Sequence, residues 1–407
     1  MRNLKNKFNT NTFIYNYMDY CENLETATDF DFWGAIWILS LLCNRNFVIN
    51  RPNSPIFPNF FITLIADSGI ARKSTAINFA KSIIENENNL IISSPMSVGK
   101  FNHALSELTK QNNECIIAIN CSEFITFYKN KSIIECLTDL YDCPKERKGY
   151  GTFNNGNINI RNIFISSYTG STPNYYIKAV NEDEIEGGFT SRNIIVFAER
   201  GKKRIAWGTD KTTINIEQLK QITNQIRFTI SKIKGAINLS PKAITRYSKW
   251  YERRRLSDNL YLKSFESREQ DHILKLASLL AINDNETEIQ YNHIDLAINI
   301  IKDYKLKAYN FFSGLLYKED NDDLSKLITK IINYIYISGE NGIYHKVLYS
   351  HIRQKCDAET LNLIINIMHE LNMIEMLQPY KSKAMIYRAT KLIKKIKIKD
   401  IINNIKQ

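Results

Sequence analysis

The apolar residues between positions 28 and 210 alternate between short continuous runs and longer stretches with helical spacing. Short runs rich in β-branched and aromatic residues are typical of buried strands, and apolar positions three or four residues apart are typical of helices. The runs predict strands at 46–50, 60–66, 115–119, 162–166 and 193–197. The spacing predicts helices at 28–42, 74–88, 98–112, 131–142 and 173–186. Strands that alternate with helices predict an α/β fold with a parallel sheet.

The pattern changes after about residue 210, where the strand-like runs end. Residues 212–235 and 240–314 have helical spacing, and the acidic stretch 318–325 is typical of a linker. Three helices, a strand, a basic turn and a second strand then follow in 325–390, which predicts a winged helix-turn-helix. The third of these helices can begin at Asp357, because an aspartate at this position caps the first free N–H groups.

These patterns divide the chain into five expected parts. They are an N-terminal arm (1–27), an α/β core (28–210), a helical region (211–320), a winged helix (321–390) and a basic tail (391–407).

Composition excludes several classes of protein. The 407 residues are 44% hydrophobic and 24% charged, which is ordinary for a folded chain and excludes global disorder. No apolar run reaches the roughly 18–20 residues of a membrane span, and the N-terminus lacks the apolar segment of a secretory signal. The seven cysteines show no CxxC spacing, and the six histidines show no zinc spacing. We therefore expect a cytoplasmic protein without a disulfide framework.

The formal net charge of +12 and the pI of about 9.1 permit nucleic acid or an anionic surface as a partner. The excess of lysine accompanies many isoleucines and asparagines, so the base composition of an AT-rich genome also accounts for part of it. The tail 391–407 is basic and amphipathic, which permits contact with a membrane surface as a minor alternative.

The segment IADSGIARKSTAINFA (65–80) predicts a strand, a turn and a helix that begins near Lys73. Backbone N–H groups in such a turn can hold phosphates, the lysine can reach the β and γ oxygens, and the Ser74 hydroxyl can bind Mg²⁺. Asp67 and Arg72 stand where the GxxxxGK[ST] pattern has glycine, so a plain strand-turn-helix remains the alternative. The expected contacts of ATP here are Ser68, Gly69, Ile70, Ala71, Arg72, Lys73, Ser74 and Thr75.

An ATPase also needs a carboxylate that polarises the attacking water. Glu123 follows the predicted strand at 115–119 and is our candidate for this base, with Ser122 in place of the usual aspartate. The alternative is that Glu123 simply lies in the first turn of a solvent-facing helix.

Two further candidates lie at later strands. Thr172 or Ser171, after the strand at 162–166, could sense the γ-phosphate, or could cap the helix that follows Pro173. Arg192, before the strand at 193–197, could act as an arginine finger on a neighbouring subunit, or could be an ordinary solvated residue.

Two basic segments are candidates for DNA contact. Residues 143–162 combine hairpin punctuation with a cationic cluster and two aromatic residues, which suits single-stranded nucleic acid, although a solvated loop is the alternative. The cluster consists of Lys145, Arg147 and Lys148. The wing of the predicted winged helix, which binds DNA or protein in such folds, offers Lys381, Lys383 and Arg388.

The motifs together resemble a known family. FWGAI (32–36) and FPNFFITLIADSGIARKSTAIN (57–78) are similar to the P-loop region of phage- and plasmid-encoded replication helicases, which also carry SG and RKST without the second glycine. SEF, GSTP and GGFTSR follow in the family's order. Residues 266–301 resemble the lid of the minichromosome maintenance helicases, in which a winged helix also follows. The resemblance covers about residues 30–390.

This resemblance implies an AAA+-type P-loop ATPase core with a helical lid and a C-terminal winged helix. It implies that Lys73 and Ser74 bind ATP and magnesium, that Glu123 activates water, and that Thr172 is the first sensor. Arg192 would be the finger that acts in trans. Lys275 falls where the lid's second sensor is usually arginine, and Arg268 lies about two helical turns earlier.

The function expected from these features is an ATP-dependent DNA helicase or translocase in replication of a phage or other mobile element. It would act on single-stranded or forked DNA as a homo-oligomer, a hexameric ring, with a separate primase or polymerase in the cytoplasm of a bacterial host. The first alternative is a DNA-binding regulatory ATPase, an origin binder or loader without unwinding activity. The second is a degenerate P-loop protein that only scaffolds DNA or partners.

Overall fold

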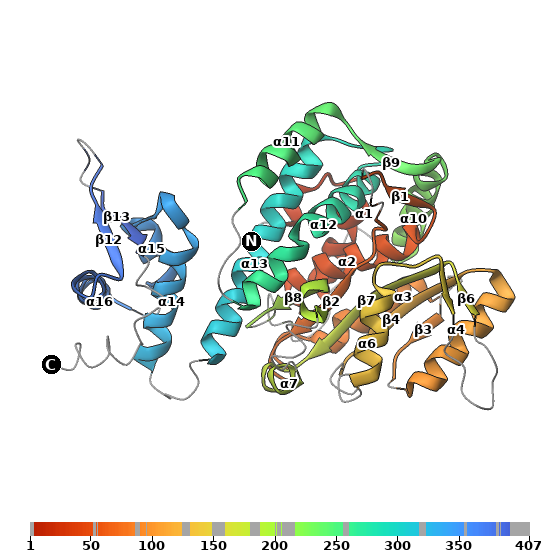
Figure 1. Cartoon of the computed structure of the whole chain (residues 1–407), viewed down its shortest axis with the longest axis horizontal. Helices are drawn as coiled ribbons and strands as arrows, with labels where there is room; N and C mark the ends of the chain where they lie inside the picture. The colour runs from red at the N-terminus through yellow and green to blue at the C-terminus, as the bar shows by residue number, and fades with distance from the viewer. Residues whose placement is uncertain are drawn as a thin grey trace. The chain divides into compact units, whose positions relative to one another are not determined.

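The chain folds as two compact units, Met1–Lys305 and Leu306–Gln407, which are described separately (Figure 1). The computed structural model describes residues 4–51, 54, 56–85, 90–94, 96–123, 131–148, 159–179, 188–199, 201, 205, 216–254, 260–316, 323–353, 356–379, 382 and 384–390. Among these residues, no helix has both the length and the apolar character that crossing a membrane requires.

A five-stranded parallel sheet forms the centre of the first unit and confirms the predicted α/β class. Its strands, in spatial order, are β3 (Leu90–Ile92), β4 (Cys115–Cys121), β7 (Ile163–Ser171), β2 (Phe61–Ile65) and β8 (Asn193–Phe197). Every described residue of β2, β4 and β7 is buried, as expected for a parallel sheet that is covered on both faces. The edge strand β3 was not predicted, because it contributes only three residues to the apolar pattern.

Four helices connect these strands at the predicted places. They are α3 (Lys73–Ile84), α4 (Val98–Asn112), α6 (Lys131–Leu140) and α7 (Pro173–Ala179). The short α9 (Phe189–Arg192), directly before β8, was not predicted. Helix α2 (Thr28–Cys43) differs from these amphipathic helices, because all of its residues from Phe30 to Cys43 are buried. A helix that is apolar on every side belongs in a core, and α2 packs between α1, α3, α12 and the sheet.

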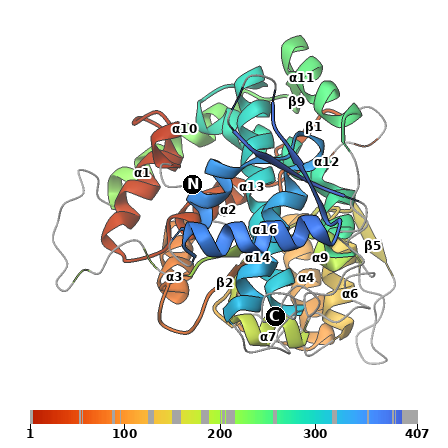
Figure 2. The same cartoon turned by 90° about the vertical axis from the view of Figure 1, so that its left-hand side faces the viewer.

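The N-terminal residues are part of this core, so the prediction of an arm at 1–27 was wrong. Helix α1 (Phe13–Tyr20) places Phe13, Ile14, Tyr17 and Met18 on one buried side. It lies beside α10 (Ile216–Ser231), as Figure 2 shows. The prediction followed the polar composition of the segment. It overlooked that apolar residues at positions i, i+1, i+4 and i+5 form a stripe along one side of a helix.

The predicted boundary at residue 210 does not separate two compact bodies. A second parallel sheet joins β1 (Phe47–Ile49), β9 (Gly235–Leu239) and β10 (Glu288–Ile289) within the first unit. Strands therefore continue after residue 210, contrary to the prediction. The helical region consists of α10, α11 (Pro241–Glu252), α12 (Leu260–Asn283) and α13 (Tyr291–Leu316).

The second unit has its own hydrophobic core. It contains α14 (Asp323–Ile337), β11 (Ile343–Tyr344), α15 (His345–Ile352), α16 (Ala358–Glu370), β12 (Ile374–Leu377) and β13 (Ile386–Ala389). The three strands form an antiparallel sheet in the order β11-β13-β12. The Asp357 carboxylate accepts a hydrogen bond from the Thr360 N–H at 2.7 Å, which confirms the predicted start of the third helix. The basic tail at 391–407 lies outside the described residues.

Candidate functional site

The chain reverses its direction along the sheet between β2 and β7. After β2 it crosses through α3 to the edge strand β3, and after β7 it proceeds to β8 on the other side of β2. Open α/β sheets bind ligands at the carboxyl ends of the strands where such a reversal occurs. Topology alone therefore points to the carboxyl ends of β2 and β7.

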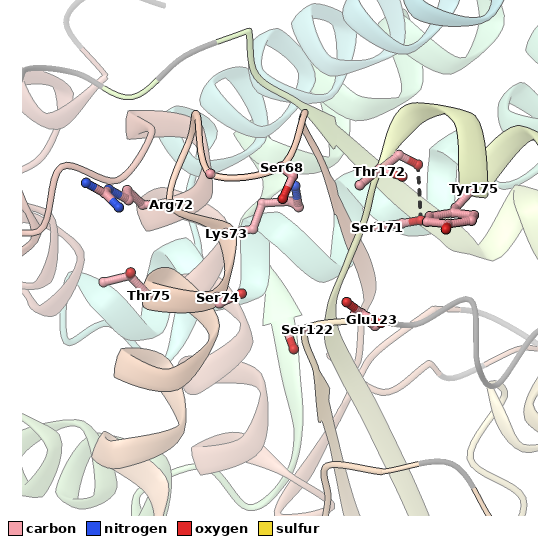
Figure 3. Close-up of a pocket in the computed structure, with 11 residues that line it drawn as sticks. Ser68, Arg72, Lys73, Ser74, Thr75, Ser122, Glu123, Ser171, Thr172 and Tyr175 are labelled. Atoms are coloured by element: carbon pink, nitrogen blue, oxygen red, sulfur yellow. Dashed lines mark hydrogen bonds between the residues drawn. The ribbon is translucent and has the colours of Figure 1, made fainter.

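A pocket with a volume of about 270 Å³ lies at this place (Figure 3). Three segments that follow β2, β4 and β7 line it, so residues about 100 positions apart in the sequence meet there. The lining consists of Ser68, Gly69, Arg72, Lys73, Ser74, Thr75, Ser122, Glu123, Ser171, Thr172 and Tyr175. The structure thus brings together the predicted phosphate-binding turn, the predicted base and the predicted sensor.

The ammonium group of Lys73 lies inside the turn that it follows. It donates a hydrogen bond to the Ala66 carbonyl and another to the Asp67 carbonyl, the latter at 3.2 Å. Burial lowers the pKa of Lys73 from its ordinary value, and the Asp67 carboxylate opposes this shift. The two hydrogen bonds hold the ammonium in the turn, and Lys73 lines the pocket as the first residue of α3, where free N–H groups and the helix dipole favour an anion.

Arg72 adopts the left-handed conformation that glycine usually supplies, with φ 52° and ψ 42°. Its guanidinium donates to the Glu25 carboxylate from Nε at 3.0 Å and from Nη2 at 2.7 Å. The other oxygen of Glu25 accepts from the Ile205 N–H at 2.6 Å. This ion pair offsets part of the backbone strain, which accounts physically for an arginine in the place of the expected glycine.

Glu123 and Ser122 follow β4 directly and face the pocket. Gly170 makes this close approach possible, because a Cβ atom there would lie 2.9 Å from the Ser122 carbonyl oxygen. Asn120, two residues before Ser122, is buried. Its side-chain amide donates to the Ile77 carbonyl at 3.1 Å and so links β4 to α3. Asn120 is therefore a structural residue, and Ser122 with Glu123 supply the polar groups.

The end of β7 supplies Ser171 and Thr172, and the Ser171 hydroxyl donates to the Thr172 carbonyl at 3.2 Å. Tyr175 on α7 also lines the pocket and is 57% exposed. Sequence reasoning missed Tyr175; its signal was an aromatic residue three positions after the predicted sensor. Ile70 and Ala71, in contrast, are predicted contacts that do not line the pocket, since Ile70 faces solvent and Ala71 is fully buried.

The lining suits magnesium bound together with a phosphate substrate. Mg²⁺ prefers oxygen ligands and usually takes only one or two from protein, the remainder coming from water and phosphates. The Ser74 and Ser122 hydroxyls and the Glu123 carboxylate are such oxygens. Across the described residues, no group of three His, Cys, Asp or Glu side chains could hold a metal ion by itself.

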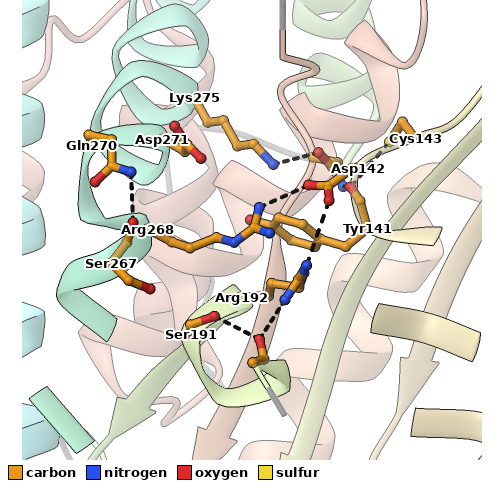
Figure 4. A network of polar contacts seen from close by, with 12 residues as sticks. Tyr141, Asp142, Cys143, Ser191, Arg192, Ser267, Arg268, Gln270, Asp271 and Lys275 are labelled. Carbon is orange, nitrogen blue, oxygen red and sulfur yellow. Dashed lines mark hydrogen bonds and ion pairs between the residues drawn. The ribbon is translucent and has the colours of Figure 1, made fainter. Parts of the chain in front are cut away.

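Arg192 lies at the opposite, amino-terminal edge of the sheet (Figure 4). It immediately precedes β8, whose first residue pairs with the first residue of β2. Because β2 has five residues, about 16 Å of strand separates this edge from the pocket. Arg192 therefore cannot reach the pocket of its own chain.

Two arginines share one carboxylate at this edge. Asp142 lies 3.6 Å from Nη2 of Arg192 and 2.9 Å from Nη1 of Arg268, and both guanidinium groups lie 5.8 Å from the centre of the Tyr141 ring. Burial, together with the charge of Arg268, lowers the pKa of Arg192 from its ordinary value. Arg268 was predicted to contact ATP; in its own chain it lies with Arg192 and not at the pocket.

Lys275 is buried in the core, so its predicted contact with ATP was wrong. Its ammonium donates to the Asn59 side-chain oxygen at 2.7 Å and lies 3.9 Å from the centre of the Tyr141 ring. The residue is only 3% exposed, and burial lowers its pKa to about 8. Helical spacing had placed Lys275 on α12 correctly, but the sheet edge against which α12 packs was not visible in the sequence.

The two strands of the predicted hairpin are present. Strands β5 (Glu146–Lys148) and β6 (Asn159–Arg161) pair antiparallel, and the tip between them lies outside the described residues. Arg147 does not face outward as predicted, because its guanidinium donates to the Cys136 sulfur at 2.8 Å and lies 3.5 Å from Asp139. Lys145 is exposed. The side chain of Lys148 and both predicted wing lysines, Lys381 and Lys383, lie outside the described part of the chain.

Comparison with known proteins found no matching family model and no matching curated protein. The candidate site therefore rests on the geometry described above and on the motif resemblance.

The strain at Arg72 can be tested by comparing two variants. Arg72→Ala and Arg72→Gly both lose the ion pair to Glu25, but only alanine retains the cost of a left-handed backbone. We expect the glycine variant to be more stable by about 1 kcal/mol in urea unfolding. Tryptophan emission suits the measurement, because Trp33 and Trp37 are buried in the core of the first unit. Equal stability of the two variants would show that position 72 is not held left-handed.

The buried ammonium of Lys275 predicts a pH dependence of stability. The unfolded chain keeps this proton until about pH 10.4, whereas the folded chain releases it near pH 8. Between these values the unfolded state binds more protons, so this group's contribution to stability increases with pH. We expect the free energy of unfolding of Lys275→Met, minus that of the wild type, to fall from pH 8 to pH 10. Lys220→Met, at an exposed position of α10, is the control and should show a constant difference.

Proposed function

We propose that this chain is an AAA+-type P-loop ATPase that acts as a DNA helicase or translocase in the replication of a phage or other mobile element. The observation that carries the proposal is the meeting of Lys73, Ser74, Glu123 and Thr172 in one pocket at the carboxyl edge of the sheet. The motif resemblance supports the same assignment, since these residues occur in the order that the helicase family has.

In this proposal the first turn of α3 binds the phosphates of ATP. Its free N–H groups donate to the phosphate oxygens, and Lys73 neutralises charge on the β and γ groups. Ser74 supplies a hydroxyl ligand for Mg²⁺, which when bound neutralises the charge that develops during phosphoryl transfer. The turn is held in place by the ion pair between Arg72 and Glu25.

Glu123 and Thr172 act on the other side of the pocket. Glu123 orients the attacking water and accepts its proton, a role that the carboxylate can fill because it lies at the end of β4 and faces the pocket. Thr172 donates from its hydroxyl to the γ-phosphate. Hydrolysis breaks the bond between the β-γ bridging oxygen and the γ-phosphorus and releases ADP and phosphate.

Arg192 is proposed to complete the site of a neighbouring subunit. Its place at the amino-terminal edge excludes a role in its own pocket but suits a heterologous contact, in which one edge of a subunit meets the opposite edge of the next. Such contacts close into a ring when the rotation permits, and we propose a hexamer. Before it reaches a phosphate, Arg192 must release Asp142, with which it is paired.

The second unit supports a winged helix, because three helices are followed by the antiparallel pair of β12 and β13. One observation favours protein over DNA as its partner: α16 contains Glu359 and Glu370 but no lysine or arginine. Of the regulatory alternatives without unwinding activity, this observation suits a loader that binds a partner protein, which is retained as the second candidate. Strand displacement from a forked substrate separates the two, since only a helicase releases the strand.

The proposed ATPase activity predicts different effects for Lys73 and Glu123. Lys73→Ala should abolish ATP binding and hydrolysis. Glu123→Gln should lower kcat by roughly 10²–10⁴-fold and retain ATP binding, because it loses only the proton acceptor. The measurements are phosphate release, with and without single-stranded DNA, and titration with a fluorescent ATP analogue. Lys81→Ala, on the same helix as Lys73, is the matched control. Hydrolysis by Lys73→Ala at the wild-type rate would refute the proposal.

The proposed action of Arg192 in trans predicts complementation between inactive variants. Arg192→Ala should reduce kcat by about 10³-fold or more. In a mixture with Lys73→Ala, about a quarter of the contacts between subunits should pair an intact Lys73 with an intact Arg192, so activity should return in part. The control replaces Arg192→Ala with the Lys73→Ala/Arg192→Ala double variant, which leaves no intact Lys73. Absence of any recovery in the first mixture would contradict a role in trans.

A further inference from the structure

Helix α11 is a basic helix that is largely exposed on the first unit. Ala243 is its only buried residue, and Ile244 and Tyr251 are 51% and 45% exposed. It lies at the edge of the unit, far from α3 and α7 in both views (Figures 1 and 2). The helix and the two residues that follow it contain one acid, Glu252, and five cations, which are Lys242, Arg246, Lys249, Arg253 and Arg254.

Four of these cations form a stripe along one side of the helix. Lys242, Arg246, Lys249 and Arg253 are spaced by four, three and four residues, which places them on one face. Arg246 is anchored to Asp295 at 2.8 Å. Lys242, Lys249 and Arg253 form no ion pair with any acid that the structure describes. The stripe is therefore an array of cations with little local compensation.

Aromatic rings border this stripe and are held in fixed positions. The guanidinium of Arg254 lies 4.9 Å from the centre of the Tyr251 ring and 5.8 Å from that of Trp250. Arg254 is itself anchored, because it donates to the Glu266 carbonyl at 3.1 Å and to the Gln270 side chain. Tyr247 stacks against Tyr251, with ring centres 6.1 Å apart. The anchored guanidinium of Arg254 and the stacking between Tyr247 and Tyr251 thus orient the aromatic rings beside the cations.

A hollow lies between the cation stripe and the aromatic rings. It has a volume of about 430 Å³, and its lining consists of Arg246, Lys249, Trp250, Arg253 and Arg254. One indole ring is therefore surrounded by four guanidinium or ammonium groups. A ligand for this hollow needs a flat apolar group beside closely spaced negative charges.

We infer that α11 binds single-stranded DNA, with phosphates on the cation stripe and a base against Trp250. Single strands present both features, a charged backbone and bases free to stack, and proteins bind them with basic grooves and aromatic rings. A duplex offers the phosphates but keeps its bases stacked inside, so the half-buried Trp250 and the exposed Tyr251 favour a single strand. An acidic peptide would match the charge but would leave the indole unused. The choice of DNA over RNA rests on the proposed function.

This assignment differs from the two places that the sequence had suggested. Arg147 of the hairpin is tied to Cys136 and Asp139. Of the predicted wing cations, Arg388 lies 3.9 Å from the Glu375 carboxylate, and Lys381 and Lys383 lie outside the described residues. The cations of α11 were overlooked because their spacing resembles that of any solvated helix face. Their significance comes from the exposure of Lys242, Lys249 and Arg253 and from the aromatic rings beside them.

The test measures binding of a fluorescein-labelled oligothymidine of about 16 nucleotides by anisotropy, without ATP and over a range of KCl concentrations. For Lys249→Ala/Arg253→Ala we expect weaker binding, with the slope of log K against log salt reduced by about 1.4, since each phosphate contact contributes about 0.7. Trp250→Ala should weaken binding about tenfold, and Trp250→Phe should restore most of it. Retained tryptophan emission of the buried core verifies that each variant folds.

The matched control is Lys220→Ala/Lys234→Ala, which removes the same charge from exposed positions outside α11 and should bind as the wild type does. All variants are also made with Lys73→Ala, so that a failure of the ATPase proposal cannot be mistaken for a failure of this one. Wild-type affinity and salt slope in Lys249→Ala/Arg253→Ala would overturn the inference. Loss of self-association with unchanged DNA binding would overturn it as well, and would make α11 a contact between subunits.

Discussion

The parallel pairing of β2 with β7 on one side and β8 on the other is the constraint on which the candidate site depends. Ile65, the last residue of β2, lies opposite Ser171, so the turn before Lys73 must emerge beside Thr172. The pairing of β4 with β7 then brings Glu123 to the same edge. A shift of one residue in either register would move these side chains to the opposite face of the sheet. The small size of Gly170 helps to make the pairing of β4 with β7 possible.

The same register separates two kinds of charge. The carboxyl edge of the sheet holds Lys73 beside the free N–H groups of α3, and the amino edge holds Arg192 and Arg268 around Asp142. In the proposed ring, the edge with the guanidinium groups of one copy would meet the edge with the phosphate-binding turn of the next. The exposed Asp142 matters here, because a single carboxylate shared by two arginines can be displaced more easily than a buried pair.

The proposed contact with DNA involves other cations than the basic segments alone suggest. A cation contributes to phosphate binding when it is accessible and lacks an internal partner, and a local sequence cannot reveal either condition. Arg147 belongs to a basic cluster, yet its side chain is only 10% exposed. Lys249 on α11 and Arg253 directly after it are both exposed. The net charge of the sequence permits an anionic partner. Packing in the folded structure determines which cations such a partner could reach.

The sequence alone determined the order and type of the local elements, because apolar periodicity, turn residues and caps act within a few residues of each other. It predicted strands β2, β4, β7 and β8, the helix that begins at Lys73, and the cap at Asp357. Tertiary structure decided which strands pair, and that β9 and β10 join β1. It also placed Lys275 beneath Tyr141 and Arg192 at the edge opposite Lys73. These outcomes depend on contacts between residues tens to hundreds of positions apart, whose energy comes from shared burial and leaves no periodic mark in either segment.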